Sequence, residues 1–213
     1  MLANAIRGLA AEFGLTAPQG MSKLSELIVL LEADGTIPEQ ARQAIRALLE
    51  QCRTLDKSIE AFEAEIVAHA RHDETARRLA TIPGIGPITA SLIAATVADI
   101  GVFRSARAFA AWLGLVPRQH STGGKTRLGR ITKAGNREIR RSLVLGATSM
   151  VYRAGVWNNA AGAWVRGILE RRPARLATVA LANKMARVAW AVMTRKEVYR
   201  PSGRHPGTAQ AAA

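Results

Sequence analysis

Hydrophobic residues recur at helical spacing along most of the chain. The first run predicts a short helix over residues 2–13 that ends at Gly14, with an apolar face of Leu2, Ile6, Leu9 and Phe13. A turn at residues 17–20 precedes a second helix, which the pattern ends at Asp34 and Gly35. Residues 1–37 are therefore predicted to form a helical N-terminal segment.

From Pro38 onward the apolar positions alternate in steps of three and four. They are Ile45, Leu48, Cys52, Leu55, Ile59, Phe62, Ile66 and His69. This is the spacing of a coiled-coil seam, so we expect a long helix over residues 38–74 that makes a homo-oligomer or pairs antiparallel. An amphipathic helix lying on the core of its own domain is the alternative. Two histidines, His69 and His72, have ligand spacing but no third ligand nearby, which favours surface positions.

The segment 75–200 reads as a helical domain. Helices are predicted over 88–98, 105–114, 136–154, 160–171 and 174–195, and the residues 201–213 lack periodicity and are expected to be a disordered tail. Aromatic residues make up only 5% of the chain, which favours packed helices over a sheet. The fold class expected is all-α, with the four tryptophans in the core or at an interface rather than stacked on bases.

The composition narrows the possible settings of the protein. A single cysteine, Cys52, excludes an internal disulfide and a cysteine metal cluster, and no stretch approaches 18 apolar residues. We therefore expect a cytoplasmic protein without a membrane partner.

Charge is divided unevenly between the two ends of the chain. Residues 1–82 hold 9 basic and 12 acidic side chains and residues 83–213 hold 21 and 4, so the net charges are −3 and +17, which sum to +14. Such a division predicts a structural front segment and a back segment that binds nucleic acid.

Two motifs in the basic part have the chemistry for nucleic-acid binding. The first, Pro83, Gly84, Ile85 and Gly86, lies between two predicted helices and is typical of a helix-hairpin-helix element, whose backbone N–H groups approach a phosphate. An ordinary helix–helix turn is the alternative. The second motif is the run 117–141, with eight basic residues and one acid, Glu138. We predict that phosphate is bound by Lys125, Arg127, Arg130, Lys133, Asn136, Arg137, Arg140 and Arg141. A solvated basic surface is the alternative, and Asn136 is also predicted to cap the helix after it.

The only serine of this run is Ser121, next to Gly123 and Gly124. A serine in a glycine-rich loop is usually a turn residue, and as a nucleophile it needs a base or metal to take its proton. The acids of the back segment do not cluster in sequence, and the neighbouring His120 would point the other way on an extended strand. The residues alone thus show a nucleophile without an activator.

The order of several motifs resembles the C-terminal domain of insertion sequence 110/116/902 family transposases. These motifs are Pro-Gly-Ile-Gly-Pro at 83–87, Phe-Ala-Ala-Trp-Leu-Gly-Leu-Val-Pro at 109–117, His-Ser-Thr-Gly-Gly-Lys at 120–125, Arg-Ile-Thr-Lys-Ala-Gly-Asn-Arg at 130–137 and Ala-Asn-Lys-Met-Ala-Arg at 182–187. The resemblance implies a recombinase in which Ser121 attacks DNA and forms a phosphoserine link. It also implies DNA and an element-encoded guide RNA as partners.

The resemblance further implies a nuclease-like domain whose four acids hold magnesium, ahead of the helices found here. The chain is therefore expected to be a truncated copy that binds no cofactor alone, needs the metal-binding domain in trans, and forms mixed oligomers with intact transposase. A non-catalytic nucleic-acid-binding protein is the rival hypothesis, and a structural RNA-binding protein is a weaker one because it gives Ser121 no role.

Overall fold

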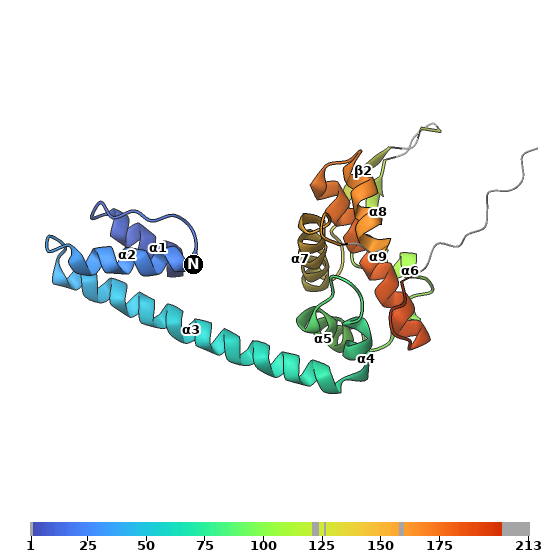
Figure 1. Cartoon of the computed structure of the whole chain (residues 1–213), viewed down its shortest axis with the longest axis horizontal. Helices are drawn as coiled ribbons and strands as arrows, with labels where there is room; N and C mark the ends of the chain where they lie inside the picture. The colour runs from blue at the N-terminus through green and yellow to red at the C-terminus, as the bar shows by residue number, and fades with distance from the viewer. Residues whose placement is uncertain (1, 121–123, 126, 158–159, 202–213) are drawn as a thin grey trace, which may run out of the picture. The chain divides into compact units, whose positions relative to one another are not determined.

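The computed structural model describes residues 2–120, 124–125, 127–157 and 160–201. Ser121 and the predicted tail beyond Pro201 lie outside the described residues. The chain divides into two compact units, residues 1–65 and 66–213, each with its own hydrophobic core (Figure 1). The expected helical fold class is confirmed, with one two-stranded hairpin added.

The first unit contains α1 (Leu2–Ala11), α2 (Met21–Ala33) and most of α3 (Glu39–His72). Their apolar faces share one cluster that includes Ile6, Leu27, Leu31, Ile45 and Leu49. The short first helix ends as predicted, since Gly14 adopts a φ of 78° that favours glycine. The segment boundaries predicted at residues 37 and 74 remain predictions.

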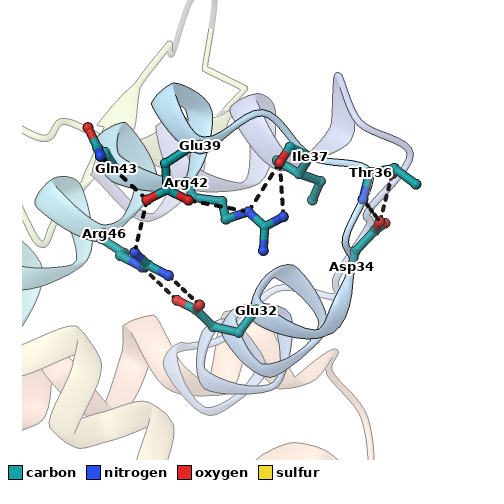
Figure 2. A network of polar contacts seen from close by, with 8 residues as sticks. All are labelled: Glu32, Asp34, Thr36, Ile37, Glu39, Arg42, Gln43 and Arg46. Carbon is teal, nitrogen blue, oxygen red and sulfur yellow. Dashed lines mark hydrogen bonds and ion pairs between the residues drawn. The ribbon is translucent and has the colours of Figure 1, made fainter.

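A polar network joins the end of α2 to the start of α3, as Figure 2 shows. Arg46 Nε donates to Glu32 Oε1 at 2.7 Å and Arg46 Nη1 to Glu39 Oε1 at 3.4 Å. The hydrogen bond from Arg46 lowers the pKa of Glu32, and the hydroxyl of Thr36 lowers the pKa of Asp34. These exposed contacts fix the turn between the two helices.

The predicted seam of α3 divides into a buried and an exposed part. Ile45 and Cys52 are buried in the core of the first unit, as the own-domain alternative predicted. Farther along, Leu55, Ile59 and Phe62 are 52%, 53% and 64% exposed. A coiled coil therefore stays a prediction for the exposed part alone. His69 and His72 lie on the surface, as expected.

The second unit is built around α9 (Ala174–Arg195), which packs against α4 (Glu74–Leu79), α6 (Ala106–Trp112), α7 (Arg137–Tyr152) and α8 (Ala160–Leu169). Its remaining elements are α5 (Pro87–Thr96), the 3-10 turn η1 (Ile100–Val102), β1 (Pro117–Gln119) and β2 (Leu128–Ile131). The core is rich in small side chains such as Ala147, Ala182 and Ala186, which let α7 and α9 approach closely. None of the described helices has the length and apolar content needed to cross a membrane.

The chain turns back after α9. Lys196, with a φ of 55°, ends the helix in the left-handed conformation. The backbone N–H of Tyr199 then donates to Thr81 Oγ1 at 2.8 Å, which fastens the last described segment beside the loop that follows α4.

Candidate nucleic-acid interface

The loop between α4 and α5 carries the first predicted motif. The two helices pack against each other across residues 80–86, which is the connectivity expected of a helix-hairpin-helix element. A Cβ on Gly84 would lie 2.6 Å from Met150 Sδ and 2.9 Å from Met185 Cε, and its φ is 86°. On the facing helix, a Cβ on Gly146 would lie 2.0 Å from the Gly84 carbonyl oxygen. The glycine at 84 is thus explained by packing.

The second glycine of this loop has a different environment. Gly86 is exposed with open space around it, and it begins α5 without a side-chain cap, followed by Pro87. The first N–H groups of a helix have no partner within the helix, and the positive end of its dipole lies there. Among the residues of the loop, Gly86 and the start of α5 are therefore the part that could meet an anion.

Three of the predicted cations lie on a β-hairpin that sequence analysis did not predict. β1 and β2 pair antiparallel, with Pro117 opposite Ile131, and the N–H of His120 donates to the Arg127 carbonyl at 2.8 Å. Lys125, Arg127 and Arg130 are all exposed. Ser121 belongs to the connection between the strands, outside the described residues.

The base of the hairpin is fixed by close backbone contacts. A Cβ on Gly135 would lie 1.7 Å from the Trp112 carbonyl oxygen, and one on Gly114 would lie 2.4 Å from the backbone of Ala134. Both glycines have positive φ, and the N–H of Lys133 donates to the Gly114 carbonyl at 3.1 Å. The Trp-Leu-Gly and Lys-Ala-Gly motifs thus form a packed junction that only glycine permits.

Two long side chains reinforce this junction from neighbouring helices. Arg140 Nη1 donates to the carbonyls of Leu113 at 3.0 Å and of Ala134 at 2.7 Å. From α9, Asn183 Nδ2 donates to the Leu115 carbonyl at 3.1 Å. The half-buried Arg140, predicted to hold phosphate, thus already makes structural hydrogen bonds, and Asn183 is a positioning residue that sequence analysis missed.

The start of α7 presents the other predicted cations. Asn136 caps the helix as expected, since its Oδ1 accepts from the N–H of Ile139 at 2.9 Å. Arg137 and Arg141 are exposed, while Ile139 and Leu143 are buried in the core. Lys133, exposed just before the cap, extends the same group. We call Lys125, Arg127, Arg130, Lys133, Arg137 and Arg141 the hairpin cations.

The described residues do not supply an activator for a serine. They contain no group of three or more His, Cys, Asp or Glu side chains that could hold a metal, so the implied magnesium does not fit this part of the chain. Asp99 accepts from the N–H of Gly101 and so caps η1. The ring of His120 lies near Gly129, where an added Cβ would be 3.2 Å from its Cδ2.

The tryptophans are in structural positions, in agreement with the prediction. Trp190 Nε1 donates to the Phe103 carbonyl at 3.0 Å, and Trp112 stacks on Phe109 with ring centroids 5.8 Å apart. Trp157 and Trp164 pack against the core. None of the four is a free platform for a base.

Comparison with known proteins gives the family of this domain. Residues 76–162 match the sequence model of the transposase IS116/IS110/IS902 family. Over 93% of its length, the chain is 45% identical to a putative transposase, y4pF/y4sB, of Sinorhizobium fredii, of which it covers 52%. It is 44% identical to a probable family 20 transposase of Pseudomonas aeruginosa, over 94% of the chain and 60% of that protein.

A third relative is the transposase for insertion sequence element IS1111A of Coxiella burnetii, which is 39% identical over 93% of the chain and 55% of its own length. The chain thus spans about half the length of the first two relatives. The matched residues contain the α4–α5 loop, the β-hairpin and α7. Residues 76–162 of this chain therefore belong to the IS116/IS110/IS902 family of transposases.

Proposed function

We propose that this chain binds DNA through the hairpin cations and the start of α5, and presents Ser121 to a scissile phosphate. The observation that carries the proposal is the exposure of all six hairpin cations around one junction of glycines and backbone hydrogen bonds. Unpaired like charges repel each other unless a polyanion neutralises them. A nucleic-acid backbone is the polyanion that a family of transposases provides.

The proposed reaction is a phosphoryl transfer to serine. A base takes the proton of Ser121, the serine oxygen bonds to phosphorus, and the bond from phosphorus to the leaving sugar oxygen breaks as that oxygen takes up a proton. Ammonium and guanidinium groups nearby would stabilise the negative charge of the phosphoryl oxygens. The family resemblance implies that the base is supplied by the nuclease-like domain, in trans for this chain. A guide RNA is proposed as a second ligand of the same cations.

The test is the covalent protein–DNA adduct, measured on denaturing gels with the ends of the cognate element. The chain is mixed with an intact family member that supplies the metal-binding domain. Wild type should form an adduct in this mixture and none alone. Ser121→Ala should abolish the adduct of this chain, whereas Ser149→Ala, a change at an exposed serine of α7, should leave it unchanged.

The second candidate is a non-catalytic nucleic-acid-binding protein that mixes with intact transposase. The exposed apolar part of α3 favours it as much as the first, because both need an interface between copies. Equal adduct levels for wild type and Ser121→Ala would support this candidate and contradict the first.

A further inference from the structure

A second group of cations surrounds a hollow in the surface of the second unit. The pocket has a volume of about 460 Å³ and lies along the C-terminal half of α9 and the segment that turns back after it. Four of its lining residues are basic, namely Lys184, Arg187, Arg195 and Arg200, against a single acid, Glu197. None of these residues belongs to the hairpin cations.

The cations of this pocket have no carboxylate partner among the described residues. No carboxylate oxygen lies within ion-pair distance of the four basic side chains in that part of the chain, Glu197 included. The ammonium of Lys184 lies 4.3 Å from the centre of the Trp164 ring, which holds it at the wall. Burial, together with the neighbouring charge of Arg187, lowers the pKa of Lys184. An anion bound here would relieve both costs.

The rest of the lining is apolar. Val188, Val192, Val198 and Tyr199 form walls between the charged groups. A free inorganic anion has no use for such walls, whereas a nucleotide joins a phosphate to a flat base and a sugar that both bury carbon surface. The volume lies in the range of small-ligand sites, about 300–1,000 Å³.

The pocket also connects to the predicted helix-hairpin-helix loop. A smaller adjoining hollow shares Lys184, Val188 and Tyr199 with it and reaches Ile82 and Pro83. The hydrogen bond from Tyr199 to Thr81 fastens this corner. A strand that passes the α4–α5 loop would thus have a path for an unstacked base.

We propose that this pocket binds a nucleotide of a single-stranded nucleic acid, with its phosphate at Lys184 and Arg187 and its base between Val188, Val192 and Tyr199. This inference rests on the proposed function, since it assumes that the chain binds nucleic acid. A paired base in a duplex is stacked inside the helix and would not enter the hollow. The site is therefore expected to discriminate single strands from duplex.

The experiment compares charge-matched variants of the full chain by fluorescence anisotropy with a labelled oligothymidylate and a labelled duplex. The pocket variant is Arg187→Gln with Arg195→Gln, and the control is Arg172→Gln with Arg175→Gln, two exposed arginines that do not line the pocket. The pocket variant should bind the single strand at least about tenfold more weakly and lower its salt slope by about 1.4, at 0.7 per lost contact. Its duplex affinity should match that of the control.

A third variant keeps the charge and fills the space. Ala191, which lines the pocket, is changed to Leu, and single-strand affinity should fall while the melting temperature stays near that of wild type. Equal single-strand binding by the pocket variant and the control would overturn the pocket while leaving the proposed function intact. Competition by inorganic phosphate as effective as by thymidine monophosphate would also overturn it, in favour of a simple anion site. A wild-type chain that binds neither probe would contradict both proposals.

Discussion

Gly135 is the residue on which the geometry of the hairpin depends most directly. Its α-carbon faces the Trp112 carbonyl so closely that a methyl group has no room, and its φ of 67° is strained for any other residue. Gly135→Ala should therefore lower the free energy of unfolding by about 2 kcal/mol or more, measured by chemical denaturation. Gly155→Ala is the control, because nothing lies within 4 Å of a Cβ there. Equal stabilities would show that the junction is not tightly packed.

Two adjacent arginines of α7 are expected to have separate roles. Arg140→Gln removes hydrogen bonds to two carbonyls and should cost about 1–3 kcal/mol of stability. Arg141→Gln, at an exposed position, should change stability by less than about 0.5 kcal/mol and weaken DNA binding. Paired melting and binding measurements check this division, and a stability loss confined to Arg141→Gln would contradict it.

The carboxylates at the start of α3 make the first unit sensitive to acid. Hydrogen bonds lower the pKa of Glu32 and of Asp34 in the folded chain, so they contribute stability above their unfolded pKa values. That contribution is lost as the pH falls through the lowered folded pKa values. Thermal melts from pH 7 to pH 2 should show a smaller acid-induced drop for Glu32→Gln than for wild type. Parallel curves would contradict the network of Figure 2.

At the scale of elements, the exposed part of α3 is the surface most suited to self-association. Leu55, Ile59 and Phe62 continue the heptad spacing beyond the core of the first unit, and large apolar side chains at this spacing form seams between helices. Ile59→Lys should shift the chain from oligomer to monomer in size-exclusion chromatography with light scattering. Val29→Lys, at a site of α2 that is 68% exposed, should not. A monomeric wild type would contradict the prediction.

The elements also separate what sequence could predict from what it could not. Helix ranges and the Asn136 cap were predictable because their signals lie within a few residues of each other. The β-hairpin was not, because its strands have only three and four residues and lack an alternating pattern. The roles of Arg140 and Asn183 depend on carbonyls 27 and 68 residues away in sequence, which no local pattern encodes.

At the scale of the molecule, the uneven charge division acquires a physical location. The six hairpin cations and the four pocket cations all belong to the second unit, whereas most ion pairs of the described residues lie in the first. In the second unit the core holds α9, and α9 in turn holds the hairpin and the pocket. The front unit is thus the structural part, and the back unit carries the exposed charge that a polyanion would neutralise.

The salt dependence of duplex binding by the full chain tests the central claim most directly. If all six hairpin cations contact phosphate, the slope of log affinity against log salt should be about −5, at 0.9 per contact. The variant with Lys125, Arg127 and Arg130 changed to Gln should reduce its magnitude by about 2.7. Changing three exposed arginines elsewhere, Arg153, Arg172 and Arg175, should reduce it far less. A duplex affinity that does not change with salt, or equal slopes for the two triple variants, would contradict the account.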